Sequence, residues 1–334
     1  MAICMDVKQV RELYAEAGER GWVLPCFCSE NLTTTEAILA ATAEHGRSIG
    51  VADLPVTVAI TVRYSHRPQA VYYTHSRRWE TGLRLFLADL NVLAGPGGPY
   101  ENLRVLVHLD HVQYDDDREL LDWDLSDFSS IMYDASALPM EQNMELTGRF
   151  AERQRNRILI EGACDEIVDA TGAAHNAFTT PDKAERYLRS TGVDLIVANL
   201  GTEHRAGTKN LEYQSAAAKA IRNAIGSKIV MHGASSVTNE QVRNLYADGV
   251  CKVNIWTTLE RDSAPVLFET LVRSADKAAG QGTAQGLMTE GLLGPAAPTG
   301  ASIALSHCTT TARQEIIYRE MIKIAGSYLA MWYV

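Results

Sequence analysis

The sequence has no long hydrophobic run, no basic block and no signal-like start. No apolar stretch reaches the roughly 20 residues that a membrane-spanning helix needs, so we expect no membrane association. The start MAICMDVKQVREL lacks a basic segment followed by an apolar run and a cleavage site, which predicts a cytoplasmic protein. A net charge of −10 without a lysine/arginine cluster argues against a nucleic-acid partner. Small anionic substrates stay compatible, because a local pocket can be basic on an acidic protein.

Paired cysteine motifs are also missing. The six cysteines are scattered, and Cys26 and Cys28, which flank Phe27 in an apolar stretch, are expected to be buried reduced thiols rather than a metal pair. Hydrophobic residues make up 46% of the chain and charged residues 22%, which is ordinary globular composition. A length of 334 residues fits two domains or one α/β barrel.

Hydrophobic patterning decides between these two. It predicts eight strands, at Trp22–Cys28, within Ser48–Ile60, and at Val105–His111, Phe128–Tyr133, Ile158–Glu161, Leu195–Asn199, Ile229–His232 and Val250–Ile255. Helices are predicted at Asp6–Glu19, from an Asn31 cap to His45, and at Arg78–Leu93, Asp115–Trp123, Pro139–Gln154, Asp182–Arg189, Ser215–Ala224, Val237–Tyr246, Leu259–Ala278 and Arg313–Leu329. The segment VRYSHRPQAVYY, from Val62, is either a loop over a pocket or a solvated face.

Eight alternations of strand and helix predict a parallel (β/α)8 TIM barrel with an additional C-terminal helix. We expect a single domain over residues 1–334. The barrel is expected over about 5–280, and the C-terminal extension and helix over about 281–334.

Polar residues gather where the predicted strands end. They are Asp110, His111, Asp134, Glu161, His204, His232 and Asn254. Active sites of TIM barrels lie at the carboxyl ends of the strands, whereas histidines that serve only the core would be scattered. The stretch VLVHLDH alone fits either a metal or acid/base site or a hydrogen-bonded core histidine pair. The coincidence of strand ends favours a metal-dependent barrel enzyme.

Eight segments carry a resemblance to a known family. They are PCFCSENLTTTEAILAATAEH, VLVHLDH, FSSIMYDASALPMEQN, ILIEGACDE, TGVDLIVANLGTEH, IVMHGASS, GVCKVNIWT and ARQEIIYREMIKIAGS. In this order they resemble the class II, metal-dependent fructose-bisphosphate and tagatose-bisphosphate aldolases. HLDH and HGAS are the specific matches.

The resemblance implies that His111, His204 and His232 bind a divalent metal, usually zinc, with positions left open for substrate. Asp110 matches the residue that exchanges a proton with the hydroxyl at the cleaved bond. Asn254 matches an amide that orients the enediolate oxygen.

Further matches concern carboxylates and the substrate phosphate. Glu161 and Asp134 match carboxylates near the metal. Glu161 is expected to be catalytic, and for Asp134 we favour support of a metal ligand. Gly233, Ser235, Thr257 and Asn254 match the phosphate site, although a turn would equally explain Gly233 and Ser235.

Several positions depart from the family pattern. Ala163 stands where a second glutamate is usual, Trp256 where an aspartate is, and Arg205 where a glycine is. Arg205 fits either phosphate or carboxylate binding or a surface ion pair. In the loop CDEIVDATGAAHN the acidic group is Asp165, Glu166 or Asp169.

We therefore predict an aldolase, a lyase that cleaves or forms a carbon–carbon bond in a ketose phosphate or related polyol through a metal-stabilised enediolate. One alternative is another metal-dependent enolate reaction, either epimerisation or aldol chemistry on a non-phosphorylated acid. A second is a catalytically silent regulatory or binding homologue. The resemblance also favours a homodimer or homotetramer. Because residues alternate along a strand, the chain must turn or bulge at Asp110 for Asp110 and His111 to face one site.

Overall fold

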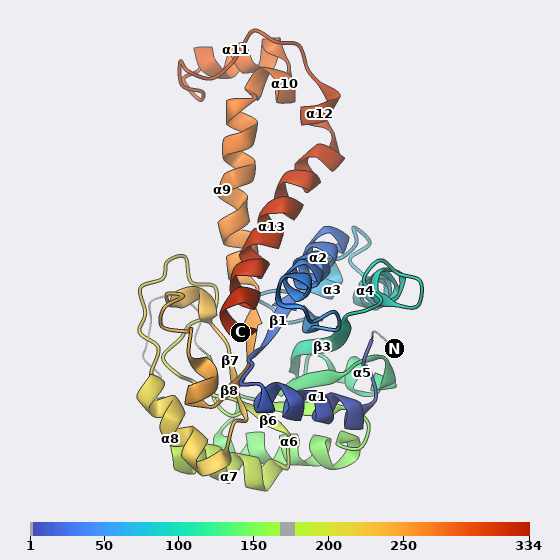
Figure 1. Cartoon of the computed structure of the whole chain (residues 1–334), viewed down its shortest axis with the longest axis vertical. Coiled ribbons are helices and arrows are strands. Elements are labelled where there is room, and N and C mark those ends of the chain that lie inside the picture. The colour runs from blue at the N-terminus through green and yellow to red at the C-terminus, as the bar shows by residue number, and fades with distance from the viewer. Residues whose placement is uncertain (1–2, 168–177) are drawn as a thin grey trace.

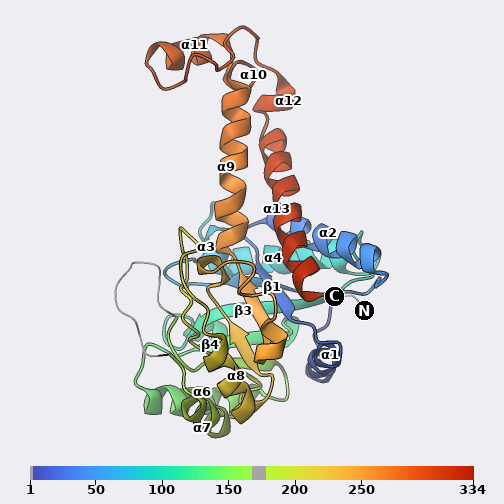
Figure 2. The same ribbon diagram turned by 60° about the vertical axis from the view of Figure 1, so that its left-hand side comes forward.

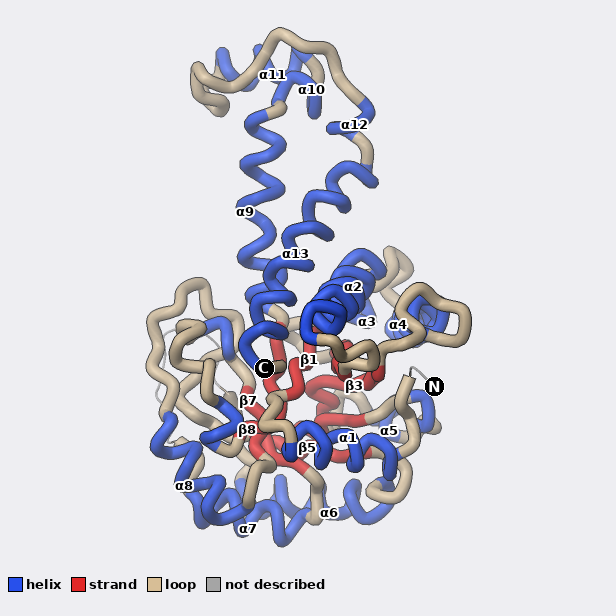
Figure 3. The backbone as a smooth tube through the Cα atoms, in the orientation of Figure 1, coloured by secondary structure: helices blue, strands red, loops and turns tan. Residues whose placement is uncertain are grey.

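Eight parallel strands form a closed barrel. The computed structural model describes residues 3–167 and 178–334. The strands follow one another around the barrel in chain order, and the last pairs with the first, which confirms the predicted TIM barrel. Figure 3 shows them at the centre with helices around them. The strands are β1 (Leu24–Cys28), β2 (Pro55–Thr61), β3 (Arg104–Gln113), β4 (Ser130–Asp134), β5 (Leu159–Ala163), β6 (Leu195–Val197), β7 (Ile229–Met231) and β8 (Val250–Ile255).

Helices cover the outside of the barrel, so the strands are buried on both faces. They include α1 (Val7–Glu19), α2 (Leu32–Ile49), α3 (Gln69–Tyr72), α4 (Trp79–Ala94), α5 (Arg118–Leu121), α6 (Met140–Gln154), α7 (Pro181–Thr191) and α8 (Ser215–Ile225). The expected cap of α2 is present, because the Asn31 side chain accepts a hydrogen bond from the Thr34 backbone N–H.

Two helix predictions are wrong. The segment 237–246 forms turns that lead into a short 3₁₀ helix, η3 (Leu245–Asp248), and 115–123 contains only the single turn α5. Side chains bind backbone groups near both segments. The Gln241 side chain accepts from the Thr238 N–H, and the Asp117 carboxylate accepts from the N–H groups of Gln113 and Arg63, which lie outside its own segment. Apolar residues of the two segments, such as Leu120 and Val242, are buried without a continuous helix.

A pair of long helices projects from the barrel. The pair consists of α9 (Thr257–Arg273) and α13 (Thr310–Trp332), and the short helices α10 (Ala275–Ala279), α11 (Gln281–Thr289) and α12 (Leu305–Cys308) form its tip (Figures 1 and 2). The predicted helix Leu259–Ala278 is therefore broken, at Ser274. The predicted C-terminal helix is present as α13, which packs on α2 and α9. In the described part of the chain, no helix combines the length and the apolar character needed to cross a membrane.

Strand β3 carries the irregularity that the sequence predicts. Its pairing with β4 shifts register between Leu109 and Val112, and His111 adopts a left-handed backbone conformation with φ of 47°. Few non-glycine residues adopt that conformation. The bulge lets Asp110 and His111, adjacent in sequence, line one pocket.

Candidate functional site

Three histidines converge at the carboxyl end of the barrel. His111 comes from the β3 bulge, His204 from the loop after β6 and His232 from the residue after β7, and one ring nitrogen of each lies within 4.8 Å of the others. The Nε2 atom of His204 is 3.3 Å from Nδ1 of His232. Zinc–nitrogen bonds of about 2.0–2.1 Å place two ligands of a tetrahedral ion about 3.3 Å apart. The largely buried triad therefore fits one divalent metal ion.

Asp134 fixes the orientation of the first of these ligands. Its Oδ2 accepts hydrogen bonds from His111 Nδ1 at 2.8 Å and from Gln113 Nε2 at 2.9 Å, and its Oδ1 accepts from the Ser136 hydroxyl at 2.6 Å. Burial raises the pKa of Asp134, but the hydrogen bonds from His111 and Ser136 outweigh it and lower that pKa to about 2. The ionised carboxylate leaves Nε2 of His111 for the metal, as the favoured interpretation of Asp134 expects.

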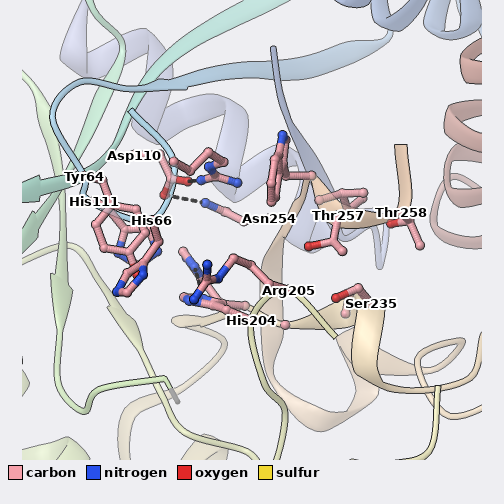
Figure 4. A pocket seen from close by; sticks show the side chains of 16 residues that line it. Tyr64, His66, Asp110, His111, His204, Arg205, Ser235, Asn254, Thr257 and Thr258 are labelled. Atoms are coloured by element: carbon pink, nitrogen blue, oxygen red, sulfur yellow. Dashed lines mark hydrogen bonds and ion pairs between the residues drawn. The ribbon is translucent and has the colours of Figure 1, made fainter. Parts of the chain in front are cut away.

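Asp110 is buried, and its carboxylate accepts hydrogen bonds from several side chains. Asn254 Nδ2 donates to its Oδ1 at 2.9 Å, and Arg67 donates to its Oδ2 at 2.5 Å. Burial alone would raise the pKa of Asp110, but the facing imidazoles and the Arg67 guanidinium lower it to well below its usual range. Figure 4 shows Asp110 and Asn254 between the histidines and the hydroxyl residues of the pocket. An ionised carboxylate thus lies beside the metal site.

Glu161 lies inside the barrel and does not line the pocket. Its Oε1 is 2.6 Å from the ammonium of Lys252, which also donates to His108 Nε2 at 3.2 Å. All three side chains are fully buried, so the pair satisfies two charges in the barrel core. The catalytic role expected for Glu161 stays a prediction. Sequence reasoning missed Lys252, although a lysine two residues before Asn254 shares its strand face.

The residues expected at a phosphate site line the other side of the pocket. Gly233, Ser235, Thr257 and Arg205 all do so, and Figure 4 shows Ser235 and Thr257 opposite His111. Gly233 has φ of 73°, and a Cβ there would lie 2.7 Å from the backbone oxygen of Glu203, so only glycine fits beside the loop that carries His204. This contact supports a turn role for Gly233 and is compatible with ligand contact.

Arg205 adopts a backbone conformation that is typical of glycine. Its φ is 53°, a left-handed conformation that glycine adopts without strain. Arg205 lines the pocket beside His204, and its expected role in binding an anion stays a prediction.

The acidic loop is only partly described. The Asp165 carboxylate pairs with Lys183 and accepts from the Thr179 hydroxyl, and the Glu166 carbonyl lies near Asn199. Asp169 lies outside the described residues.

The first part of the segment after β2, residues 62–68, forms a loop at the pocket, which was one of the two interpretations of this segment, and its second part forms α3. Tyr64, His66 and Arg67 line the pocket. The Tyr64 ring stacks on His111 with ring centroids 4.4 Å apart and planes within 5°. These residues were not predicted individually; the mixture of basic and aromatic residues was the only signal for them.

Comparison with known proteins identifies the family. The sequence model described as "Fructose-bisphosphate aldolase class-II" matches residues 8–292. The chain belongs to this family. Fructose-bisphosphate aldolases of Staphylococcus epidermidis and Treponema pallidum are 25% and 27% identical to it, over 81% and 75% of this chain and 88% and 82% of theirs.

Solved structures agree at the level of the fold. The crystal structure of fructose-bisphosphate aldolase from Campylobacter jejuni superposes with a TM-score of 0.74 at 17% identity, over 99% of this chain and 96% of that one. The two chains therefore share one fold over nearly their whole lengths.

Proposed function

We propose that the protein is a metal-dependent aldolase that cleaves and forms a carbon–carbon bond in a ketose phosphate, with zinc as the metal. The observation that carries the proposal is the largely buried histidine triad, which lines one pocket together with the Asp110 carboxylate. Asp110 supplies the sole carboxylate among the described residues that line it.

Each polar residue then has a defined task. His111, His204 and His232 would hold the metal, which when bound polarises the substrate carbonyl and stabilises the negative charge that develops on its oxygen. Asp110 takes the proton of the hydroxyl at the cleaved bond and returns it in the reverse direction. Asn254 keeps the Asp110 carboxylate in place through its 2.9 Å hydrogen bond and offers its amide to the substrate.

The phosphate is assigned to the side of the pocket that holds Ser235, Thr257, Gly233 and Arg205. The first two offer hydroxyls, Arg205 offers a charged fork, and Thr257 begins helix α9, where backbone N–H groups are unpaired. Both relatives named above are fructose-bisphosphate aldolases, which supports a sugar phosphate as substrate. The expected homo-oligomer and cytoplasmic location stay predictions.

Solvent exchange tests the proposal directly. The metal-loaded protein is incubated with dihydroxyacetone phosphate in deuterium oxide, and loss of the α-proton signal is followed by NMR. We expect exchange that chelation abolishes, that zinc restores and that His232→Ala removes, whereas His307→Ala, at the distant tip of the helix pair, retains it. Tight binding of other acids without any exchange would favour a different enolate reaction or a silent homologue.

Asp110→Ala separates metal binding from bond cleavage. This variant should keep the metal and lose ketose cleavage by about 100-fold or more, because a positioned acid/base contributes about that factor. Metal content and cleavage rate are measured on the same sample. Full cleavage activity in Asp110→Ala would refute the assigned role.

A further inference from the structure

Arg67 occupies a place in the pocket that neither the metal nor the phosphate assignment uses. Its guanidinium lies between the Asp110 carboxylate, which it contacts at 2.5 Å, and the ring of Trp256, whose centroid is 4.9 Å away. The Arg67 side chain is 12% exposed and lines the pocket. A charged fork with one wall of carboxylate and one wall of aromatic ring is therefore presented to the substrate.

The backbone that carries Arg67 is anchored. The Thr61 hydroxyl donates to the Arg67 carbonyl, and the Gln69 side chain accepts from the Thr61 N–H at 2.9 Å. The platform is anchored as well, because Trp256 Nε1 donates to Glu30 at 2.6 Å and Gln69 Nε2 donates to the same oxygen at 2.8 Å. One network thus holds the arginine loop and the tryptophan together.

The hydrogen-bonding capacity of Arg67 is not filled. Its Nε–H is buried and has no acceptor among the described residues, although a guanidinium offers five donors. Buried donors are normally satisfied, so this N–H leaves room for an acceptor that the described residues do not supply. A carboxylate or phosphate oxygen fits, because arginine binds such groups through two parallel N–H donors.

The unfilled hydrogen-bonding capacity of Arg67 bears on the role of Asp110. Its Oδ2 receives Arg67 and lies 3.4 Å from the Cys28 sulfur, while its Oδ1 receives Asn254. An anionic group that draws the guanidinium towards itself across the Trp256 face vacates a hydrogen-bonding position on Oδ2. That position is the one that the substrate hydroxyl needs.

We propose that Arg67, supported by Trp256, recognises an anionic group, carboxylate or phosphate, on the aldehyde half of the substrate, and that this contact frees Asp110 for the substrate hydroxyl. The proposal rests on the proposed aldolase function. In the synthetic direction the donor α-carbon loses one proton to solvent, and the electron pair of that C–H bond forms the new bond to the aldehyde carbon. The C=O π pair becomes a lone pair on oxygen, and Asp110 passes one proton from solvent to that oxygen, so that protons balance and no oxidant or reductant is needed.

A matched set of aldehydes tests the recognition. Dihydroxyacetone phosphate is the donor, and glycolaldehyde, glyoxylate and glycolaldehyde phosphate are a neutral, a carboxylate and a phosphate acceptor. In the metal-loaded wild type we expect the higher kcat/KM for one or both anions, and which of them responds identifies the group. Arg67→Gln should lower kcat/KM for that anion about 10- to 100-fold, the worth of a charged hydrogen bond, and change it less than 3-fold for glycolaldehyde.

Two further variants control for charge and for folding. Arg67→Lys keeps the charge without the fork and should recover part of the loss. Arg63→Gln removes an equal charge from the same loop, where Arg63 pairs with Glu119 and stacks on Trp79, and should leave the aldehyde preference unchanged. An equal loss for all three aldehydes in Arg67→Gln, or no loss at all, overturns the proposal.

Two measurements separate this inference from the proposed function. Deuterium exchange into dihydroxyacetone phosphate needs no aldehyde, so its persistence in Arg67→Gln shows an intact metal site. If wild-type protein shows no exchange, the aldolase proposal has failed, and calorimetry with propionate and ethyl phosphate decides on Arg67 alone. Weaker binding of one probe to Arg67→Gln than to Arg63→Gln then supports anion recognition, and equal affinities overturn it.

Discussion

Glu260 has one carboxyl oxygen that receives no hydrogen bond from the described residues. It lies in the first turns of α9, and its buried Oε1 has no hydrogen-bond partner among the described residues. Burial and the nearby Glu30 carboxylate raise the pKa of Glu260 to about 7. The Glu30 carboxylate accepts hydrogen bonds from the side chains of Trp256 and Gln69. The ionised form of Glu260 is therefore unfavourable in the folded protein.

Glu260→Gln should remove a pH dependence of stability. A folded pKa of about 7, above the ordinary 4.5, makes the contribution of this group fully present below pH 4.5 and lost as the pH rises through 7. Glutamine does not titrate, so the Tm difference between variant and wild type should grow from pH 4.5 to 7 and then level off. The shift corresponds to at most about 3 kcal/mol. A difference that does not vary with pH would show that Glu260 is solvated.

Some residues of the pocket and the barrel core could be predicted from the sequence, and others could not. Asp110, His111, His204, His232 and Asn254 were placed correctly in one pocket because strand ends of a barrel meet at one edge. Arg67 could not be placed in the pocket from sequence. It lies in a loop whose path is set by side-chain contacts of Thr61 and Gln69, and hydrophobic periodicity does not predict such contacts. Lys252 was missed because a lysine in a short strand is normally exposed, and its partner Glu161 lies 91 residues away.

Among the elements, strand β3 was the most predictable. Its alternation and its two functional neighbours required a bulge, and the register shift and the φ of His111 confirm it. The segments at 115–123 and 237–246 were not, because their apolar spacing fits a helix although turns bury the same residues. Asp117 binds backbone N–H groups of β3 and of the segment after β2, and such tertiary contacts are not visible in periodicity.

The crossing of α3 and α4 positions the loop that carries Arg67. The two helices pack on each other, and a Cβ added at Gly82 of α4 would lie 1.9 Å from the Ala70 carbonyl oxygen of α3. The obstacle is backbone, so no side-chain rotation relieves it. Gly82→Ala should force the helices apart and lower the free energy of unfolding by about 1–3 kcal/mol, measured by urea unfolding.

Gly286→Ala is the matched control for this effect. Gly286 lies inside α11, is exposed, and has nothing within 4 Å of an added Cβ. There the same substitution should stabilise the protein by about 0.5–1 kcal/mol, because alanine loses less conformational freedom in a helix. Equal effects at the two positions would show that the α3–α4 crossing adapts without cost.

On the scale of the whole molecule, closure of the barrel brings together residues that no single segment contains. It brings His111 and His232, from β3 and from the end of β7, to one point. The eight alternations predicted this closure, because right-handed crossovers leave few other arrangements. The projecting pair of α9 and α13 was not predicted as a pair, since its partners are set by tertiary packing of α13 on α2 and α9.

A metal ion bound at the histidine triad should therefore raise the free energy of unfolding of the whole barrel. A ligand that binds only the folded barrel raises the free energy of unfolding by RT ln(1 + [L]/Kd), about 2.7 kcal/mol when free metal exceeds Kd 100-fold. Zinc should raise the Tm of the chelated protein with increasing concentration, and calorimetry should show no such rise for His232→Ala. His307→Ala, at the distant tip of the helix pair, should respond to zinc as the wild type does. A zinc-dependent rise that persists in His232→Ala would place the stabilising metal outside the triad.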